Sequence, residues 1–583
     1  MEKMLNIKIN NIPCSVPYGT KIIDAARMVG IEIPTLCYLK EMNEIGACRF
    51  CVVEVVGARS LVAACVFPIE REGTEIFTNS EKVRKARKTT LELILSTHNR
   101  KCLSCVRSGN CELQRLCKEY NVTEEDRFDG NKPVYELDYS AAHMVRDNNK
   151  CILCRRCVAA CDNQGISVIG ANARGIDTHI ASPFELPLGS TSCISCGQCI
   201  VNCPVGAIYE KDDTEKVFSA ISDPTKHVVV QAAPAVRATL GECFDMPIGT
   251  DVTGKMFAAL RRLGFDKVFD TNFAADLTIM EEATELLSRV KNGGVLPMIT
   301  SCSPGWIKYC EHYYPTELDH LSTCKSPMQM QGAIIKSYYA EKNGIDPKDI
   351  VSVAIMPCTA KKFECGRADE AGAGYPDIDY VLTTRELGRM IDAAGIKFTA
   401  LPDEDCDAPL GQGTGAAVIF GTTGGVMEAA LRTAAEVITG KSLDNPEFHD
   451  VRGMEGVKEA SYDLDGTEIK VAIASGTKNA KILMDKVKDG TADYTFIEIM
   501  GCPGGCINGG GQPVQPASVR NTVDLKALRA KALYENDAKR PHRKSHENED
   551  VKAVYAEYLG EPNSHKAHEL LHTSYVARPM FDK

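Results

Sequence analysis

The segment CILCRRCVAAC, residues 151–161, decides how the front of this chain folds. Its cysteines follow the spacing C-x2-C-x2-C-x3-C, and the same spacing returns in CISCGQCIVNC, residues 193–203. Two such runs typically hold a pair of [4Fe–4S] clusters, with the fourth cysteine of each run binding the cluster of the other run. One cluster is therefore predicted on Cys151, Cys154, Cys157 and Cys203, and a second on Cys193, Cys196, Cys199 and Cys161.

A third cysteine group lies near the N-terminus, with the spacing C-x10-C-x2-C-x13-C. This spacing is close to that of a four-thiolate [2Fe–2S] site, although it is looser than the plant-type run. The preceding segments are strand-like at 4–16 and helix-like at 20–30, which indicates a small β-grasp module. The predicted ligands are Cys37, Cys48, Cys51 and Cys65.

A fourth group, HNRKCLSCVRSGNC at residues 98–111, supplies His98, Cys102, Cys105 and Cys111. Three cysteines and a histidine are also a common set for structural zinc. Because this group lies between two sets of iron–sulfur spacing, we interpret it as a further [4Fe–4S] site. The front of the chain is then a relay of one [2Fe–2S] and three [4Fe–4S] clusters.

Composition limits the cellular compartment and the class of partner. The chain has 583 residues, a net charge of −11 and 26 cysteines. The negative charge argues against nucleic acid or an anionic membrane as the main partner. We find neither an apolar signal segment at the N-terminus nor a run of 18 apolar residues. So many cysteines without an export signal indicate reduced thiolate ligands in a cytoplasmic protein.

The second half has a different sequence pattern, in which apolar runs typical of buried strands alternate with segments typical of helices. The expected strands are HVVVQAAP, VSVAIMP, AAVIFG and DYTFIEIMG, and the expected helices include TIMEEATELLSRVKN and TTRELGRMIDAAG. This alternation predicts α/β sheets covered by helices. Polar, Gly- and Pro-containing stretches at 120–148 and 211–226 are expected to be connections. The glycine-rich GTGAAVIFGTTGG fits neither the Rossmann nor the P-loop fingerprint.

The few cysteines of this half come directly after expected strands. Cys358 follows VSVAIMP, and Cys502 and Cys506 follow DYTFIEIMG. Ligands of open α/β sheets gather at the carboxyl ends of strands, so these cysteines are expected to converge with the loop that carries Cys302 and Ser303.

Three motifs in these loops, TSCSPGW, MPCTAKKFE and MGCPGGCINGGGQP, resemble the signatures of the [FeFe] hydrogenase family, and the resemblance extends over essentially the whole chain. The arrangement is similar to that of the monomeric, multi-cluster, clostridial ferredoxin-linked type. It implies an H-cluster, which is a [4Fe–4S] cubane joined to a diiron unit with CO, CN⁻ and azadithiolate ligands. Cys358, Cys502 and Cys506 would bind the cubane, and Cys506 would also bridge to the diiron unit. Lys361 would hydrogen-bond a cyanide, and Ala233, Pro234, Met356, Phe420 and Met500 would line the pocket.

The chain departs from the family pattern at Ser303, where the second cysteine of T-S-C-C-P-x-W is a cubane ligand. Serine is a poor iron ligand because its hydroxyl loses a proton far less readily than a thiol does. Three outcomes remain open: Ser303 binds as an alkoxide, Cys302 shifts into the ligand role, or Cys310 substitutes. Met328 and Ala360 are further departures, at positions where many relatives carry a polar side chain.

A proton route is implied beside the electron route. Glu282 and Glu285 are three residues apart on an expected helix, so they share one face. Thr278 and Glu281 are expected to form a capping box at the start of that helix. The family resemblance implies that the Cys302 thiol hands protons to the diiron site and that the route runs Cys302–Glu282–Ser322–Glu285 to the surface.

The implied function is reversible H2 formation from protons and electrons by a monomer. A ferredoxin or flavodoxin would be the electron partner, and maturation proteins would supply the diiron unit. The expected domains are 1–80 ([2Fe–2S] β-grasp module), 81–120 (a [4Fe–4S] module with one histidine and three cysteine ligands), 139–213 (two-cluster ferredoxin), 214–524 (H-cluster domain) and 525–583 (small-subunit-like tail). One alternative is the large iron–sulfur subunit of respiratory NADH dehydrogenase, which resembles residues 1–213 but lacks the rear motifs. The other is a hydrogen-sensing, low-activity or cluster-assembly relative with a pocket altered at Ser303 and Met328.

Overall fold

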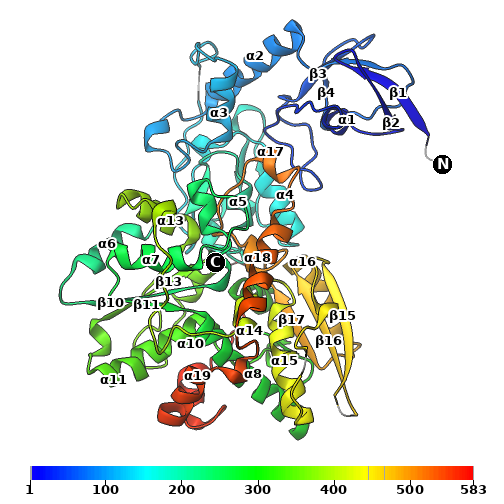
Figure 1. Cartoon of the computed structure of the whole chain (residues 1–583). Helices are drawn as coiled ribbons and strands as arrows, with labels where there is room; N and C mark the ends of the chain where they lie inside the picture. Colours follow the sequence, from blue (N-terminus) through cyan, green and yellow to red (C-terminus); the bar gives the residue numbers. More distant parts are fainter. Residues whose placement is uncertain (1–2, 131, 444, 465, 582–583) are drawn as a thin grey trace.

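The computed structural model describes residues 3–130, 132–443, 445–464 and 466–581. Small N-terminal modules are stacked on one end of a larger body of mixed helices and strands (Figure 1). In the part of the chain that is described, no helix combines the length and the apolarity that a bilayer span requires.

The first module is a five-stranded sheet with the order β2-β1-β5-β3-β4. Leu5, Ile7 and Ile9 alternate with exposed residues along β1 and are buried, as expected of a strand with one face on a core. The helix α1 contributes Ile22 and Ile23 to the same core. The bounds are β1 (Met4–Ile9), β2 (Ile12–Pro17), α1 (Ile22–Met28), β3 (Val52–Val55), β4 (Val62–Ala63) and β5 (Glu75–Phe77).

Helices α2 (Glu81–Thr97) and α3 (Glu112–Glu119) frame the second module. The third contains two short helices that contact each other, α4 (Arg156–Asn163) and α5 (Gln198–Asn202). Its remaining strands are β6 (Met144–Arg146), β7 (Gly170–Asn172), β8 (His179–Ala181) and β9 (Ile208–Glu210), which pair as β6-β9 and β7-β8. The expected connection at 211–226 contains a helix, α6 (Thr214–Ser222).

Two four-stranded sheets form the centre of the large body. The first has the order β11-β10-β13-β14 and is parallel throughout. The second has the order β12-β17-β16-β15, and only β15 runs antiparallel to its neighbour. The bounds are β10 (His227–Ala232), β11 (Lys267–Asp270), β12 (Met298–Ile299), β13 (Ile350–Met356), β14 (Tyr380–Thr383), β15 (Val457–Leu464), β16 (Thr467–Ser475) and β17 (Phe496–Met500).

Helices cover these sheets because the central strands are apolar on both faces. Side chains of α7 and α13 pack with β10 and β13, those of α9 and α16 pack with β16 and β17, and α8 and α15 pack on the same two strands in a separate cluster. The bounds are α7 (Thr253–Leu263), α8 (Asn272–Asn292), α9 (Pro304–Tyr313), α10 (Pro327–Ile334), α11 (Ala340–Asn343), α12 (Ala360–Glu364), α13 (Thr384–Ala393), α14 (Gly415–Val418), α15 (Gly425–Thr439), α16 (Thr477–Lys488) and α17 (Ala517–Arg520).

Two local expectations in this half were wrong. The apolar run AAVIFG is not a strand but the short helix α14 followed by a 3-10 turn at Ile419–Gly421. A short, fully buried apolar run does not distinguish strand from helix by periodicity. Thr278 caps no helix, because α8 already begins at Asn272, and the Thr278 hydroxyl donates to the Ala274 carbonyl at 2.8 Å.

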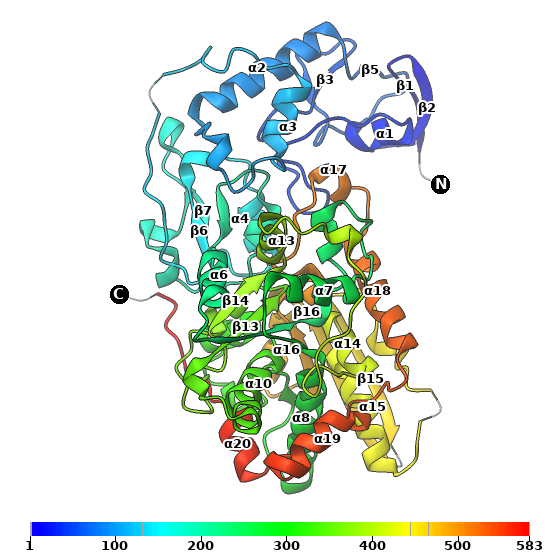
Figure 2. The ribbon, with the colours of Figure 1, turned by 60° about the vertical axis from the view of Figure 1, so that its left-hand side comes forward.

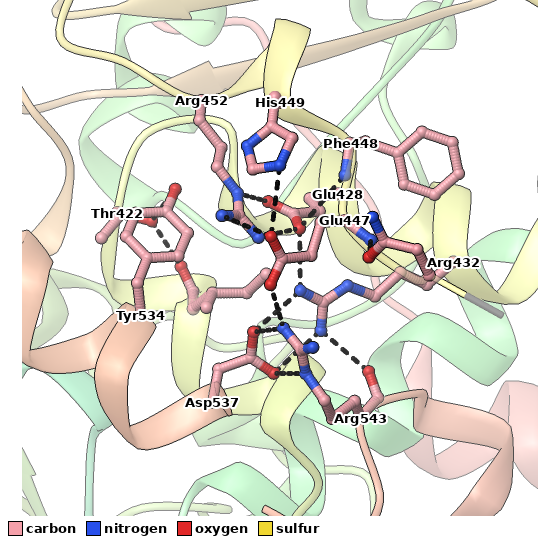
Figure 3. Close-up of polar contacts among 12 residues, drawn as sticks. Thr422, Glu428, Arg432, Glu447, Phe448, His449, Arg452, Tyr534, Asp537 and Arg543 are labelled. Atoms are coloured by element: carbon pink, nitrogen blue, oxygen red, sulfur yellow. Dashed lines mark hydrogen bonds and ion pairs between the residues drawn. The ribbon is translucent and has the colours of Figure 1, made fainter. Parts of the chain in front are cut away.

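The C-terminal segment wraps the large body through α18 (Leu525–Lys539), α19 (Glu549–Val554) and α20 (His565–Leu571). Asp537 of α18 accepts hydrogen bonds from Arg432 of α15 at 2.9 Å and from Arg543 at 2.7 Å, and Arg432 also pairs with Glu428 (Figure 3). Removing one partner of such a buried charge network is strongly destabilising. Beyond it, α19 and α20 lie at the end of the molecule opposite the N-terminal modules, beside α8 and α10 (Figure 2).

Candidate active site

The carboxyl ends of strands from both sheets meet at one cavity lined mostly by buried residues. Ala233 and Pro234 follow β10, Cys358 follows β13, Cys302 follows β12, and Cys502 follows β17. The cavity is also lined by Cys506 and Ser303. The chain order thus brings together loops separated by up to about 270 residues, at the strand ends where open α/β sheets bind ligands.

The loop that holds Ser303 is shaped by the start of α9. Pro304 occupies the first helical position, where its missing N–H costs nothing. Ser303 is the N-cap residue, but its hydroxyl does not cap the helix. Instead, the Gly501 N–H donates to Ser303 Oγ at 3.0 Å, so the hydroxyl faces the loop that carries Cys502.

Cys310 lies elsewhere. It is fully buried in a hydrophobic cluster with Trp306 and Tyr309, and its thiol points to the Tyr314 carbonyl at 3.8 Å. It is absent from the described residues that line the cavity.

The rest of the cavity wall is mostly apolar. It contains all five of the expected lining residues, Ala233, Pro234, Met356, Phe420 and Met500, and also Met328. Sequence reasoning missed Thr271 and Ala275, which line the same cavity at the start of α8. Their position just after β11 was the available signal, because that strand belongs to the same parallel sheet.

Lys361 on α12 is the cation of the cavity wall. Burial opposes its charge, but the Glu364 carboxylate at 2.8 Å outweighs burial and raises the pKa of Lys361. Its Nζ donates to the Cys302 carbonyl at 3.3 Å. A permanent cation is therefore held against a nearly dry cavity, where it can bind an anionic group.

Two glycines let the loops that carry Cys358 and Cys506 pack closely, backbone against backbone. A Cβ on Gly509 would lie 2.2 Å from the Pro357 carbonyl oxygen, and a Cβ on Gly511 would lie 2.9 Å from the Cys358 nitrogen. Three thiols and an apolar wall fit an iron–sulfur cofactor, because thiolates are the ligands that such clusters prefer. The residues present therefore fit the cofactor implied by the motifs.

A line of polar groups leads away from the cavity. Burial raises the pKa of the Cys302 thiol well above its usual range, and the nearby Glu282 carboxyl adds to the effect. Burial and the neighbouring Glu285 raise the pKa of Glu282 to about 8, and a hydrogen bond between Glu282 and the Ser322 hydroxyl partly offsets this rise. The Ser322 hydroxyl donates to Glu285 Oε2 at 3.0 Å, and Arg289 pairs with Glu285 at 2.7 Å. Ser322 thus lies between Glu282 and Glu285, and Glu282 is a neighbour of Cys302, while the proton route through these four residues stays a prediction.

The eight cysteines of the two ferredoxin-like runs separate into two groups. A small cavity is lined by Cys151, Cys154 and Cys157 of the first run and by Cys203 of the second. Conversely, Cys161 of the first run has the thiols of Cys193 and Cys196 of the second run as its neighbours. This crossed arrangement is the one that the spacing predicts.

The four cysteines of the first module also come together. The Cys51 and Cys65 sulfurs are 3.3 Å apart, and a hydrogen bond from the Cys37 thiol lowers the pKa of Cys48 to about 6. Burial lowers the pKa of His98 to about 4, and its Nδ1 has no hydrogen-bond partner among the described residues. A buried, neutral imidazole with a free nitrogen is suited to bind a metal.

The two-cluster module contacts the cysteine loops of the cavity directly. Thr359, next to Cys358, donates to the Ser195 carbonyl at 2.8 Å, and Gln198 donates to the Asn508 carbonyl at 2.8 Å. A Cβ on Gly510 would lie 2.2 Å from the Cys196 carbonyl oxygen, so only glycine permits this backbone approach. The cluster site of Cys196 is therefore the relay site that adjoins the cavity.

Protein-family models match successive parts of the chain. They are the 2Fe-2S iron–sulfur cluster binding domain (residues 2–81), the NADH-ubiquinone oxidoreductase-G iron–sulfur binding region (87–126), the 4Fe-4S dicluster domain (150–207), the C-terminal domain of the iron-only hydrogenase large subunit (226–510) and the iron hydrogenase small subunit (523–578).

Individual proteins are similar over nearly the whole chain. The NADP-reducing hydrogenase subunit HndD of Solidesulfovibrio fructosivorans is 48% identical, with 99% of each chain covered. Iron hydrogenase 1 of Clostridium pasteurianum is 43% identical and covers 98% of this chain and 100% of its own. Among solved structures, the [FeFe]-hydrogenase HydA1 of Chlamydomonas reinhardtii matches with a TM-score of 0.56 and 44% identity, over 63% of this chain and 99% of its own.

Proposed function

This chain belongs to the iron-only, or [FeFe], hydrogenase family, and from that premise we propose that it catalyses 2 H⁺ + 2 e⁻ ⇌ H2 with electrons relayed through four iron–sulfur clusters. The observation that carries the proposal is the cavity where Cys302, Cys358, Cys502 and Cys506 converge beside Lys361. In the NADH dehydrogenase alternative, the rear half would lack the motifs that supply Cys358 and Cys506.

Cys358, Cys502 and Cys506 would hold the cubane of the H-cluster, and Cys506 would also bridge to the diiron unit. When bound, the H-cluster supplies the iron chemistry that joins protons and electrons into H2. Lys361 would bind an anionic ligand of the diiron unit. The apolar lining, including Met356, Phe420 and Met500, excludes water and so strengthens each polar contact inside. Maturation proteins would deliver the diiron unit.

Protons would move between Cys302, Glu282, Ser322 and Glu285. The thiol of Cys302 stays protonated because it is buried, so it can donate a proton at the cavity wall. Glu282 can recharge it, because a pKa of about 8 keeps this carboxyl close to the operating pH. Ser322 joins Glu282 to Glu285 through its hydroxyl.

Ser303 would stand at the fourth ligand position of the cubane. Its hydroxyl lines the same cavity as the three ligand cysteines, whereas Cys310 lies in helix packing away from it. We therefore favour a cubane with three thiolates and a weak or altered oxygen ligand. A hydroxyl donates less charge to iron than a thiolate does, so the potential of the cubane should differ from that of a four-thiolate site.

The proposed electron partner is a reduced ferredoxin or flavodoxin that exchanges electrons with the N-terminal clusters. A second candidate follows from the similarity to HndD, whose name describes a subunit of an NADP-reducing hydrogenase. In that case a partner protein would carry the nucleotide chemistry, because the glycine-rich segment 411–425 fits no nucleotide fingerprint. All 26 cysteines are free in the structure, which agrees with a reducing, cytoplasmic setting.

The test is H2 evolution by the purified chain after the diiron unit has been installed. Reduced methyl viologen should support turnover, and reduced ferredoxin should replace it. NADPH alone should support none, and turnover with NADPH that requires an added flavoprotein would favour the second candidate. If the fully loaded chain evolves no H2 with reduced methyl viologen, the enzymatic proposal is wrong and a sensing role becomes the better account.

A further inference from the structure

Two polar side chains beside Glu285, those of Cys324 and His572, have no part in the proposed proton route. A carboxylate oxygen of Glu285, the thiol of Cys324 and a ring nitrogen of His572 all lie within 4.8 Å of one another. The helix α8 supplies Glu285, the loop before α10 supplies Cys324, and the end of α20 supplies His572. Three distant segments thus meet where the proposed route nears the surface.

The neighbours of Glu285 differ in their ability to exchange protons. Arg289 pairs with it at 2.7 Å but stays protonated at any physiological pH. The Thr323 backbone N–H donates to it at 3.1 Å and does not titrate. Burial raises the pKa of the Cys324 thiol well above its usual range. Among these groups His572 alone carries an imidazole, whose two ring nitrogens can accept a proton on one side and donate one on the other.

The backbone fixes His572 in this position. Residues 323–325 and 571–573 pair like antiparallel strands: the Thr573 N–H donates to the Thr323 carbonyl, and the Lys325 N–H donates to the Leu571 carbonyl, both at 2.8 Å. The Thr323 hydroxyl lies 2.7 Å from His572 Nδ1. The imidazole is therefore held beside Glu285 at a distance that one water molecule can bridge.

A second histidine links this position to solvent. The ring of His568, one turn earlier on α20, stacks on the ring of His572 with centroids 3.9 Å apart. His568 is exposed, whereas the side chain of His572 is only 5% exposed. Burial and the adjacent His572 lower the pKa of His568, because two stacked imidazoles do not both carry a charge easily.

We propose that His572 and His568 form the solvent-side port of the proton route, with His572 exchanging protons with Glu285 and His568 exchanging them with bulk water. This proposal rests on the proposed function. During H2 evolution an imidazolium at His572 loses a proton to the Glu285 carboxylate through a bridging water, and His568 then reprotonates the neutral imidazole. During H2 oxidation each transfer runs in reverse, so no charge accumulates at the port.

The charges around the pair favour this role. From α8, a carboxylate oxygen of Glu281 lies 3.2 Å from His572 Nε2, and a carboxylate oxygen of Glu285 lies within 4.8 Å of a His572 ring nitrogen. The Tyr555 hydroxyl donates to Glu281 and holds that carboxylate in place. On α20 itself, His565 opposes a second positive charge on His568. His572 thus faces two carboxylates of α8 that can accept a proton from it.

The test compares the pH profile of H2 turnover in His572→Gln, His568→Gln and His565→Gln. His565 is the matched control, because it lies on the same helix and its side chain is 90% exposed and pairs with Glu569. We expect His572→Gln to lower turnover on the order of tenfold at neutral pH, below the ~10²–10⁴-fold typical of a positioned acid–base group, because water can partly replace it. His568→Gln should show a smaller loss, and His565→Gln none.

Added imidazole should restore part of the rate in His572→Gln. A second measurement does not require turnover: after a pH jump, the infrared CO and CN⁻ bands of the bound cofactor should relax more slowly in His572→Gln while reaching the same final spectrum. A wild-type rate, an unchanged pH profile or an unchanged relaxation in His572→Gln would overturn the port. An inactive wild-type chain would instead overturn the proposed function, so the two failures are distinguishable.

Discussion

Two adjacent residues, Cys302 and Ser303, have the positions of a proton donor and of a cluster ligand, and they can be separated by substitution. Replacing Cys302 with alanine removes the buried thiol from the cavity wall but leaves Cys358, Cys502 and Cys506. We expect turnover to fall by ~10²–10⁴-fold, as for loss of a positioned acid–base group, while the infrared CO and CN⁻ bands persist. Loss of the cubane signal in Cys302→Ala would show instead that Cys302 is a ligand.

The second residue-scale prediction concerns Ser303. In Ser303→Cys a thiol replaces the hydroxyl that accepts the Gly501 N–H at 3.0 Å, and it can bind iron as a thiolate. The cubane should then withstand iron loss better and shift its reduction potential, measured by iron analysis after chelator treatment and by a spectroscopic redox titration. Ser303→Ala is the control, because it removes the hydroxyl without adding a ligand. An unchanged spectrum and potential in Ser303→Cys would contradict the ligand position.

At the scale of elements, α8 buries an acid along the proposed route, and this has a consequence for stability. Burial and Glu285 raise the pKa of Glu282 from 4.5 to about 8. Below pH 4.5 the carboxyl is protonated in both folded and unfolded chains. Between pH 4.5 and 8 only the folded chain keeps the proton, so stability falls as pH rises, by a total on the order of 5 kcal/mol.

Glu282→Gln should therefore flatten the decline in unfolding temperature between pH 5 and 8, because the amide stays neutral. It should also lower turnover strongly, because an amide does not carry a proton along the route. Calorimetry and H2 assays on one preparation measure both effects. The exposed Glu341→Gln on α11 is the control. A decline as steep as in the wild type would mean that Glu282 is charged in the folded protein at neutral pH.

Elements also show what sequence could and could not predict. The spacing of cysteines in a cluster motif indicates which thiols bind one cluster. The cysteines of the front modules and the strand-end cysteines of the large body could therefore be grouped from sequence. The run AAVIFG was expected to be a strand but includes the helix α14. The prediction failed because a fully buried apolar run shows neither the helical nor the strand period. The start of α8 was misplaced because Thr278 bonds back to Ala274 within the helix. His572 meets Glu285 through pairing between residues about 250 apart, which no local pattern reveals.

At the scale of the whole molecule, the modules are arranged in the order in which electrons would pass. The two-cluster module lies between the N-terminal modules and the large body (Figure 1). Its Cys196 loop contacts the cavity loops at Gly510, and on the far side of the large body α19 packs on α8 and α20 packs on α10. Electrons would thus enter from one end of the molecule and protons from the other, with the cavity between them. This separation lets each route be blocked without the other.

The metal content of the whole chain tests the relay. We expect about 14 iron atoms in the front modules, two from one [2Fe–2S] and four from each of three [4Fe–4S] centres. The informative site is that of His98, Cys102, Cys105 and Cys111, because its ligand set also suits zinc. Iron and zinc are measured in wild-type protein and in Cys105→Ser, both made without the diiron unit. The difference between the two gives the metal content of this site, and the variant should lose about four iron atoms. One zinc per chain that disappears in Cys105→Ser would show that this site is structural. Electrons would then have to pass from the [2Fe–2S] module to the two-cluster module without it.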